Sequence, residues 1–488
     1  MRERLASLFE RRFGVAPAGI VGLAGDGSNR SYRRLLGPDG RSVVGVVGLD
    51  RDENRAFLSY TRSFHRVGLP VPELYAEDED AGIYIIEDLG DTTLFDALEE
   101  ARAAQPGGGV EPAGPTLFPE SMLKVYEEAV RSLPRFQVEG HAVVDYGVAY
   151  PHEEFGRQSI AWDLNYFKYH FLKLAHVPFS EARLETDFGR LADFLLAADR
   201  DAFLYRDFQS RNIMVTTAGL KFIDYQGGRR GAVHYDIASL LYDAKADLPE
   251  PVRVRLLDRY LEALEDHRPV DRPRFIELYR GFVLVRILQA LGAYGYRGFF
   301  ERKPRFLRSV PYAARNLQQL LRDGLPLDLP EIEAVVSRIV DTWGGDANDS
   351  EEVASLTVQV RSFSYRRGYP EDRSGHGGGH VFDCRAIPNP GRDPEFRALT
   401  GLDGPVREYL ERIPEAEGFL EHACALSRTQ IEEYVRRGFD QFSIAFGCTG
   451  GQHRSVYFAD RLATRLREEY PGVRVRLEHR ERHTWPAR

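Results

Sequence analysis

The sequence predicts two domains of different class, an α+β domain followed by a compact α/β domain. Residues 1 to about 90 contain several short β-branched runs, as expected for a small sheet. From there to residue 343 the apolar residues mostly recur at helical spacing. After residue 351 strand-like and helix-like segments alternate, which is typical of an α/β domain. A chain of 488 residues is also too long for one ordinary domain.

The first lobe is expected to be a small sheet with one helix. "GLAGDGSNRSYRRLL" indicates a turn-rich loop between two short strands, and "RSVVGVVGL" is a strand by its β-branched content. "DENRAFLSYTRSFHRVG" spaces Phe57, Tyr60 and Phe64 at helical intervals and ends at Gly68, where a helix is expected to stop. Two further strands are expected in "LPVPELYAED" and "GIYIIEDLGD".

The rest of the chain divides at a polar segment. Residues 91–343 form the expected helical lobe, interrupted by a low-complexity loop, "ARAAQPGGGVEPAGPT". "WGGDANDSEE" is rich in Gly, Asp and Glu, so residues 344–351 are the predicted linker between domains 1–343 and 352–488. In the second domain strands are expected in "SLTVQVRSF", "GHVFDCRAI" and "FSIAFG", and helices in "PVREYLERI", "QIEEYVRRG" and "VYFADRLATRLREEY".

The composition restricts the class of protein. Hydrophobic residues make up 43% and charged residues 28%, as in a soluble globular protein. The formal net charge of -9 provides no overall basic field for wrapping nucleic acid. Three cysteines without a CxxC spacing argue against a disulfide framework and structural zinc. No apolar run approaches the ~20 residues of a membrane span, and the first residues do not resemble a signal peptide. We therefore expect a cytoplasmic protein.

Three polar residues in the helical lobe suggest a catalytic centre. "FLYRDFQSRNIMV" places Asp207 five residues before Asn212, and "LKFIDYQGG" adds Asp224 directly after a strand. Phosphoryl transfer to a hydroxyl needs a carboxylate that accepts the hydroxyl proton and oxygen ligands that hold Mg²⁺ against the phosphates. Asp207 fits the base, and Asn212 and Asp224 fit the metal ligands. One Asp–Asn pair alone would more often be a turn, but three such residues in order after a β-rich lobe favour catalysis.

Residues 1–343 resemble the aminoglycoside phosphotransferase and choline kinase family, which has a bilobal, protein-kinase-like fold. The likeness rests on "GDGSNRSYRRL", "IIEDLGDTTLFD", "YRDFQSRNIMV", "FIDYQGG" and "HYDIASLLYD". It extends in particular to bacterial kinases of N-acetylmuramate and N-acetylglucosamine in cell-wall recycling. The resemblance implies ATP and Mg²⁺ as cofactors, Asp207 as catalytic base and Asn212 and Asp224 as metal ligands. It also implies that Asp236 braces the catalytic loop.

The chain departs from this family pattern at two positions. Kinases of this fold usually carry a strand lysine that holds the nucleotide phosphates and pairs with a helix glutamate. Glu53 is the candidate glutamate, but the strand "RSVVGVVGL" has no lysine, and the sequence does not decide whether Arg30, Arg33 or Arg41 replaces it. Tyr205 stands at a scaffold position where His is usual. The expected nucleotide contacts, including the hinge for adenine, are Gly25, Gly27, Ser28, Arg33, Glu87 and Leu89.

A second motif, "GCTGGQHRS", lies between the strand "FSIAFG" and a helix beginning near Val456. A Gly-rich loop before a helix N-terminus directs backbone N–H groups and the helix dipole at an anion. Gly450 and Gly451 let a ligand approach the backbone, and Arg454 adds a guanidinium for phosphate. A tight structural turn is the alternative, but Arg454 and the neighbouring His453 favour an anion site.

The same loop also matches the Cys-x5-Arg signature of cysteine-dependent phosphatases, through Cys448 and Arg454. In those enzymes a thiolate attacks phosphorus while the arginine holds its oxygens. They usually have His where this chain has Gly447, and no general-acid Asp loop is evident. We therefore rank the phosphatase hypothesis second.

Residues 352–488 resemble the C-terminal domain of the RNase adapter protein RapZ. The likeness rests on "HVFDCRAIPNPGRDPEFRALTGLDGPVREYL", "GCTGGQHRSVYFADRLA" and "LEHRE". In that family the domain binds glucosamine-6-phosphate and a small regulatory RNA. Gly391 occupies a place where the family can carry His. The residues that match the phosphosugar pocket are Asp383, Arg385, Asn389, Thr449, Gly450, Gly451, His453 and Arg454.

RNA binding is the property least expected to transfer from that family. The N-terminal half of RapZ proteins is a P-loop domain, whereas this chain has no G-x-x-x-x-G-K-[ST] motif. The tail "RVRLEHRERHTWPAR" is Arg-rich but short and interrupted by acidic residues, so we interpret it as a solvated terminus.

Both halves point to amino sugars. We expect an ATP- and Mg²⁺-dependent kinase for an amino sugar of cell-wall recycling, joined to a domain that senses an amino-sugar phosphate, with no membrane partner. The competing class is a non-catalytic adapter whose kinase-like half only binds nucleotide, which the missing lysine favours. The sequence leaves open the sugar, the hydroxyl and whether the protein forms a homo-oligomer.

Overall fold

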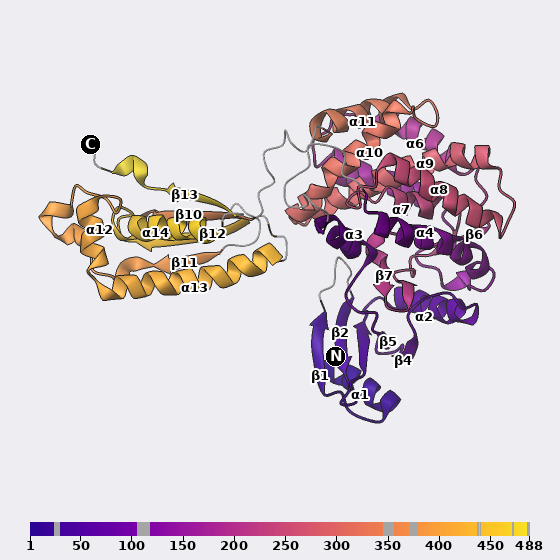
Figure 1. Cartoon of the computed structure of the whole chain (residues 1–488). Helices are drawn as coiled ribbons and strands as arrows, with labels where there is room; N and C mark the ends of the chain where they lie inside the picture. Colours follow the sequence, from indigo (N-terminus) through magenta and orange to yellow (C-terminus); the bar gives the residue numbers. More distant parts are fainter. Residues whose placement is uncertain are drawn as a thin grey trace. The chain divides into compact units, whose positions relative to one another are not determined.

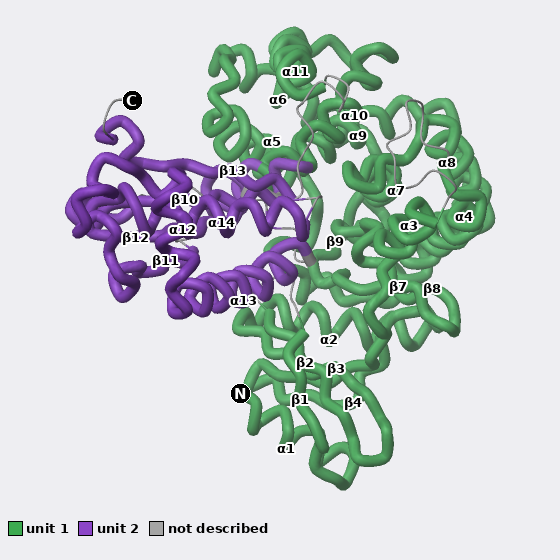
Figure 2. Tube along the Cα trace, turned by 60° about the vertical axis from the view of Figure 1, so that its left-hand side comes forward, with its two compact units in different colours: residues 1–294, 309–344 green, residues 295–308, 345–488 purple. Residues whose placement is uncertain are grey.

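The computed structural model describes residues 1–23, 30–104, 118–344, 356–370, 379–436, 439, 441–470 and 473–485. The chain divides into two compact units, the first of residues 1–294 and 309–344 and the second of residues 295–308 and 345–488 (Figure 2). The predicted linker lies outside the described residues from 345 onward. Most of the predicted low-complexity loop, at 105–117, also lies outside them.

The elements before residue 345 begin with a helix and a small sheet and continue mainly as helices. The strands are β1 (Gly19–Leu23), β2 (Ser31–Leu36), β3 (Ser42–Val47), β4 (Leu74–Asp78), β5 (Ile83–Glu87), β6 (Ala202–Leu204), β7 (Ile213–Thr216), β8 (Gly219–Phe222) and β9 (Arg229–Gly231). The helices are α1 (Arg2–Phe13), α2 (Arg51–Arg66), α3 (Leu94–Ala103), α4 (Glu120–Arg135), α5 (Arg157–Phe167), α6 (Glu181–Leu195), α7 (His234–Leu241), α8 (Glu250–Glu265), α9 (Arg272–Gly295), α10 (Val310–Arg322) and α11 (Pro330–Trp343).

The small lobe of unit 1 is a five-stranded antiparallel sheet in the order β1-β2-β3-β5-β4 (Figure 1). Because side chains alternate along a strand, the sheet presents two different faces. One face packs against α1, through Leu35, Val43, Val47, Ile83 and Ile85 of the sheet and Leu5, Leu8 and Phe9 of the helix. On the other face Tyr84 stacks on Phe57 of α2, with ring centroids 5.0 Å apart.

Helix α2 connects this sheet to the large lobe. It begins at a capped N-terminus, where the Asp50 carboxylate accepts hydrogen bonds from the backbone N–H groups of Asp52 and Glu53. Its buried stripe contains the predicted Phe57, Tyr60 and Phe64. The Tyr60 hydroxyl donates to the carbonyl oxygen of Gly228 at 3.0 Å, so the helix is held against the segment that follows Asp224.

The large lobe is mainly helical, with two short antiparallel sheets set into it, β6 with β9 and β7 with β8. The predicted catalytic residues lie in the segments that these strands connect. β6 leads into the segment of Asp207, β7 follows Asn212, and β8 leads into Asp224. The predicted α+β, protein-kinase-like bilobal class of this domain is confirmed.

Unit 2 contains a four-stranded sheet in the order β11-β12-β10-β13, with every neighbouring pair parallel. Helix α14 packs on β10, β12 and β13. The elements after residue 355 are β10 (Thr357–Ser364), β11 (His380–Asp383), β12 (Gln441–Cys448), β13 (Arg474–His479), α12 (Gly404–Glu411), α13 (Pro414–Arg436) and α14 (Arg454–Glu469). The predicted α/β class is confirmed. Since the strands are parallel, their C-terminal ends share one edge, where ligands commonly bind in such sheets.

Two segments differ from the sequence-based expectation. Residues 2–13, to which the sequence assigned no structure, form α1 because Leu5, Leu8 and Phe9 bury one helix face on the sheet. The interpretation of the tail as a solvated terminus is wrong for β13, which pairs in parallel with β10. Its Val475 and Leu477 alternate with charged residues and pack against the core of unit 2.

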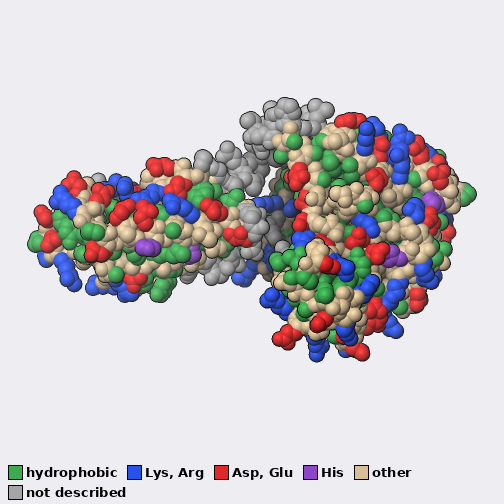
Figure 3. All heavy atoms as spheres, turned by 60° about the horizontal axis from the view of Figure 1, so that its bottom comes forward, with side chains coloured by type: hydrophobic (Ala, Val, Ile, Leu, Met, Phe, Trp, Pro, Cys, Tyr) green, Lys and Arg blue, Asp and Glu red, His purple; other side chains and the backbone are tan. Residues whose placement is uncertain are grey.

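The surface and the helices give two further observations. Among the described residues, no helix combines the length and hydrophobicity that a membrane span requires. On the face drawn in Figure 3, acidic and basic side chains are interspersed over each unit.

Candidate functional site

The predicted catalytic base lies in the loop between β6 and β7. The backbone carbonyl of Asp207 accepts two hydrogen bonds, from the N–H of Gln209 at 2.9 Å and from Nδ2 of Asn212 at 2.8 Å. This turn fixes the buried Asn212 beside the half-buried Asp207. Within the described part of the chain we find no hydrogen bond to the Asp207 carboxylate, which leaves it able to accept one from a substrate hydroxyl.

Asp224 meets Asn212 at the end of the β7–β8 hairpin. Nδ2 of Asn212 donates to Oδ2 of Asp224 at 3.1 Å, and the N–H of Ile223 donates to the carbonyl of Asn212 at 3.0 Å. Asp224 has a φ of 68°, a backbone conformation that few non-glycine residues adopt and that often marks a functional position. Burial and the nearby charge of Asp207 raise the pKa of Asp224. The structure thus brings together all three residues predicted for catalysis.

A hard divalent cation fits this pair of side chains. Both hydrogen bonds of the Asn212 amide use Nδ2, so its amide oxygen remains as an acceptor beside the Asp224 carboxylate. A cation there would also relieve the repulsion between Asp224 and Asp207. The described residues contain no group of three or more His, Cys, Asp or Glu side chains that could hold a metal. Asp224 and Asn212 would therefore need further oxygen ligands, such as phosphates.

Asp236 holds the loop that contains the predicted base. Its two carboxylate oxygens accept hydrogen bonds from the backbone N–H groups of Tyr205 and Arg206, each at 2.9 Å, and Nε2 of Gln137 donates at 3.2 Å. Burial raises the pKa of Asp236 to about 7, although these hydrogen bonds act in the opposite direction. The buried Tyr205 hydroxyl donates to the carbonyl of Ile223 at 2.7 Å, which joins the catalytic loop to the segment of Asp224.

A buried ion pair holds the residue before the base. Arg206 has a φ of 81°, and its guanidinium donates to both oxygens of Asp163 on α5 at 2.7 Å. It also donates to the Tyr235 hydroxyl at 2.6 Å. A bidentate pair of this kind fixes orientation as well as charge. Asp163 was not among the predicted site residues, because nothing in the segment "RQSIAWDLNYF" distinguishes it from a surface residue of a helix.

Of the residues predicted to contact the nucleotide, Gly25, Gly27 and Ser28 lie outside the described residues. Glu87 ends β5, and its carboxylate accepts from Nζ of Lys221 at 3.1 Å. This contact ties the predicted hinge to β8 in the large lobe. Leu89 is half-buried, two residues further along the same connector.

The structure separates the three arginines that are candidates to replace the strand lysine. Arg33 pairs in register with Gly45, and a side chain at Gly45 would meet Leu5 and Leu35, so Arg33 belongs to the face covered by α1. Arg41 is exposed and lies over the ring of Phe13. Arg30 instead contacts Glu53, with Nη2 3.4 Å from Oε1. The assignment of Arg33 to the nucleotide therefore conflicts with its position in the sheet.

The second candidate site lies at the shared C-terminal edge of the unit 2 sheet. Ser364, Asp383 and Cys448 end β10, β11 and β12, and the Ser364 hydroxyl donates to the carbonyl of Thr449 at 2.8 Å. Thr449 and Gly450 are exposed, so their backbone is accessible to a ligand. Gly451 has a φ of 69°, which favours glycine at that position of the loop.

Two predicted ligands in this loop are turned inward. Nη1 of Arg454 donates to the carbonyl oxygens of Arg385 and Ile387, at 3.1 and 2.6 Å, and the side chain is 5% exposed. Nε2 of His453 lies 2.9 Å from the carbonyl of Phe396. Both side chains therefore anchor the Gly-rich loop to the segment after β11. Their direct contact with a phosphosugar stays a prediction.

Cys448 does not have the surroundings of an exposed nucleophile. Its Sγ is buried, shares a hydrogen bond with the Ser455 hydroxyl over 3.1 Å and accepts one from the N–H of Gly451 at 3.2 Å. A nucleophilic thiolate has to reach its substrate. This arrangement favours a binding loop over a phosphatase centre.

The remaining predicted phosphosugar ligands lie at the end of β11 and on the turn that follows it. Asp383 and Arg385 form an exposed pair, with Nη2 2.6 Å from Oδ2, and the guanidinium of Arg385 lies over the ring of Tyr365. Oδ1 of Asn389 accepts from the N–H of Gly391 at 3.3 Å. A side chain at Gly391 would meet the ring of His453, which places this glycine against the Gly-rich loop.

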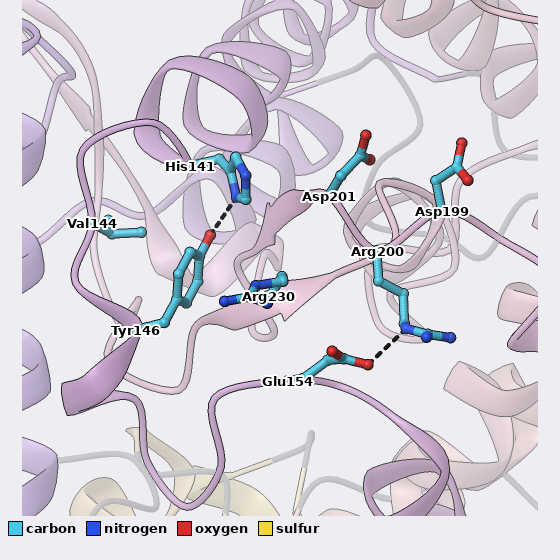
Figure 4. Close-up of a pocket in the computed structure, with 8 residues that line it drawn as sticks. All are labelled: His141, Val144, Tyr146, Glu154, Asp199, Arg200, Asp201 and Arg230. Carbon is cyan, nitrogen blue, oxygen red and sulfur yellow. Dashed lines mark hydrogen bonds and ion pairs between the residues drawn. The ribbon is translucent and has the colours of Figure 1, made fainter.

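Unit 1 also contains a cavity of about 620 Å³ whose lining includes none of the predicted site residues (Figure 4). Among the lining residues, Nδ1 of His141 lies 2.8 Å from the Tyr146 hydroxyl, and Arg200 pairs with Glu154 at 2.7 Å. The cavity reaches Asp201 before β6, whereas Asp207 follows the other end of that strand. It is therefore separate from the catalytic loop.

Comparisons with known proteins match each of the two parts of the chain to a family model. A family model described as the phosphotransferase enzyme family matches residues 19–274, more than half of the chain. A model of the RapZ C-terminal domain matches residues 356–483. In a comparison of structures, choline kinase from Streptococcus pneumoniae is 17% identical with a TM-score of 0.41, covering 64% of this chain and 97% of its own.

Two curated relatives are both described as nucleotide-binding proteins. The one from Acidithiobacillus ferrooxidans is 40% identical over 132 residues, which cover 27% of this chain and 42% of the relative. The one from Desulforudis audaxviator is 37% identical over 169 residues, which cover 35% of this chain and 54% of the relative. The chain thus spans only about half the length of these relatives. From the match over residues 19–274, the chain belongs to the phosphotransferase enzyme family, and its C-terminal part is a RapZ C-terminal domain.

Proposed function

We propose that this protein transfers the γ-phosphoryl group of ATP to a hydroxyl of an amino sugar of cell-wall recycling, and that its C-terminal domain senses an amino-sugar phosphate. The observation that carries the kinase proposal is the meeting of Asp207, Asn212 and Asp224 in one hydrogen-bonded cluster. Membership of the phosphotransferase enzyme family supports it.

Each residue of the cluster has a chemical role in this proposal. Asp207, whose carboxylate has no other hydrogen bond among the described residues, accepts the proton of the attacking hydroxyl. Asn212 and Asp224 hold Mg²⁺, which screens the charge of the phosphates when bound. Asp236 keeps the loop rigid, because it satisfies two backbone N–H groups next to the base.

The choice of an amino sugar rests on both halves of the chain. The catalytic segments resemble kinases of N-acetylmuramate and N-acetylglucosamine, and the second domain matches the RapZ C-terminal domain. The resemblance to RapZ implies glucosamine-6-phosphate as the ligand of that domain. The exposed Thr449–Gly450 backbone and the parallel-sheet edge support a binding role for that domain.

A second candidate function is a non-catalytic nucleotide-binding adapter. The observation that favours it is strand β3, "SVVGVV", which carries no lysine to hold the nucleotide phosphates. The curated relatives described as nucleotide-binding proteins are compatible with it. A protein that binds ATP but transfers its phosphoryl group to no acceptor would be such an adapter and not a kinase.

The test is incubation of the full chain with ATP, Mg²⁺ and a panel of acceptors. The panel contains glucosamine, N-acetylglucosamine, N-acetylmuramate, glucose, choline and an aminoglycoside, and mass spectrometry detects phosphorylated product. We expect phosphorylation of one or more amino sugars and none of glucose. Phosphorylation of choline or the aminoglycoside alone would contradict the substrate class. ATP binding with no product from any acceptor would support the adapter.

A further inference from the structure

The small lobe has no cation on the strand where this fold usually places one. Along β3 the side chains on one face pack under α1, and Val44 and Val46 lie on the other face, which faces α2. None of these residues can bind phosphate. A basic side chain from another element must therefore bind the phosphates of the nucleotide, or no basic side chain of this lobe binds them.

Arg30 lies next to β3 and is fixed to α2. It directly precedes β2, whose Ser31 pairs in register with Val47, and it lies on the same side of the sheet as Tyr32 and Tyr84. Its Nη2 lies 3.4 Å from Oε1 of Glu53 and 3.3 Å from the Glu53 carbonyl oxygen. The guanidinium also lies over the ring of Phe57, 5.6 Å from its centroid. The ion pair with Glu53 and the packing of the planar guanidinium over Phe57 therefore hold the side chain in one orientation.

A continuous set of contacts joins Arg30 to the proposed metal ligands. Nε2 of Gln226 lies 3.3 Å from Oε1 of Glu53 and donates to Oδ1 of Asp224 at 2.7 Å. The other oxygen of Asp224 accepts from Asn212. Burial acts to lower the pKa of Arg30, but the charges of Glu53 and Asp224 and two nearby tyrosines raise it overall. Arg30 therefore stays positively charged, and its charge interacts with that of the proposed metal ligand Asp224.

We propose that Arg30 holds the phosphates of the bound nucleotide in place of the strand lysine, and that Glu53 and Gln226 position it. A guanidinium binds phosphate oxygens with two parallel N–H groups, so it suits a nucleoside di- or triphosphate at least as well as an ammonium group does. The chain can then bind a nucleotide although strand β3 has no lysine. This inference rests on the proposed kinase function only for the identity of the nucleotide as ATP.

The test compares phosphate-bearing and phosphate-free ligands of the same base. Affinities of the full chain for ATP, ADP and adenosine are measured by calorimetry with Mg²⁺ present, for the wild type and for Arg30→Ala and Arg30→Lys. We expect Arg30→Ala to weaken ATP and ADP by about ten- to a hundredfold and adenosine by less than about twofold. Arg30→Lys should recover part of the loss, since it restores the charge. Arg62→Ala, which removes the partly exposed ion pair between Arg62 on α2 and Glu77 on β4, is the matched control and should bind all three ligands normally.

Glu53→Gln tests the positioning role. It should weaken ATP binding less than Arg30→Ala does, and the double variant should be no weaker than Arg30→Ala alone, because both changes act on one contact. Unchanged ATP affinity in Arg30→Ala would overturn the inference, as would a selective loss of ATP in Arg33→Ala instead. An equal loss of adenosine and ATP in Arg30→Ala would show a structural role. If the wild type binds ATP but phosphorylates no acceptor, the kinase proposal is refuted. The affinities of the Arg30 variants would still decide whether Arg30 binds the nucleotide phosphates.

Discussion

Nδ2 of Asn212 donates a hydrogen bond to Oδ2 of Asp224 at 3.1 Å, which brings two residues twelve positions apart onto one site. The hairpin of β7 and β8 between them makes this possible, since its antiparallel register pairs Ile213 with Phe222. The same amide donates to the carbonyl of Asp207. One side chain therefore sets the relative position of the proposed base and the proposed cation site.

The first prediction concerns the cation. In Asp224→Ala the half-buried carboxylate is lost and Asn212 is left as a neutral ligand, so ATP affinity should no longer increase when Mg²⁺ is added. Calorimetric titrations with Mg²⁺ and with EDTA measure the difference. Asp207→Asn is the control, because it leaves both metal ligands in place and should keep the Mg²⁺ dependence. A Mg²⁺ effect of wild-type size in Asp224→Ala would refute the assignment of Asp224.

The second prediction concerns the pair of Arg206 and Asp163. Asp163→Ala leaves a buried guanidinium without its partner, which should lower the free energy of unfolding by about 3–5 kcal/mol. The side chains of Arg206 and Asp163 are 17% and 8% exposed, respectively. Asp193→Ala is the control, because Asp193 and Arg157 are 68% and 58% exposed and such pairs contribute only ~0–1 kcal/mol. Urea unfolding monitors both variants, and equal effects would show that the buried pair has no special role.

The third prediction is a pH dependence of stability from His234. The ring stacks with the rings of Phe275 and Phe282, and burial, together with the charges of Arg268 and Arg274, lowers its pKa to about 3. In the unfolded chain His titrates near ~6.5, so below that pH the unfolded state binds a proton that the folded state does not. This contribution to stability is complete above pH ~6.5 and is lost as the pH falls toward 3.

His234→Phe removes this titration while keeping an aromatic ring in the stack. Lowering the pH from 7.5 to 5 should reduce the free energy of unfolding of the wild type by about 2 kcal/mol more than that of the variant. Denaturant unfolding at the two pH values measures it. A stability difference between variant and wild type that does not change with pH would contradict the neutral state of the buried ring.

The fourth prediction separates binding from thiol chemistry in unit 2. Cys448→Ser should retain binding of glucosamine-6-phosphate, because a serine hydroxyl can take over the hydrogen bonds that the buried Sγ forms with the N–H of Gly451 and the Ser455 hydroxyl. Arg454→Ala should weaken that binding by about one to two decades, because the loop loses its anchors to Arg385 and Ile387. Arg461→Ala, on the half-exposed side of α14, should bind normally. Hydrolysis of an aryl phosphate by the wild type that disappears in Cys448→Ser would instead support the phosphatase hypothesis.

The cluster of Asp207, Asn212 and Asp224 could be predicted from the sequence because its geometry is local. Asp207 and Asn212 share one turn, and a single hairpin returns the chain to Asp224. The choice between Arg30 and Arg33 was not accessible, since it depends on strand register. A shift of one residue turns a side chain to the opposite face of a sheet, and only the pairing of Arg33 with Gly45 decides it.

Other features depend on contacts between distant parts of the sequence. Arg454 and His453 have the residue types of anion ligands, yet they bind backbone carbonyls 57 to 69 residues earlier in the chain. Strand β13 has charged residues at every second position, which suggested a solvated tail. The pairing with β10, more than one hundred residues earlier, makes it a strand. Local pattern could not reveal either contact.

The most direct test of the central claim is the rate of amino-sugar phosphorylation by the wild type and by Asp207→Asn, measured together with ATP affinity. Loss of a general base typically lowers a rate by ~10²–10⁴-fold. The account predicts product from the wild type, a loss of that size in Asp207→Asn, and ATP affinity in the variant close to that of the wild type. An Asp207→Asn variant that phosphorylates the sugar at the wild-type rate would contradict the account.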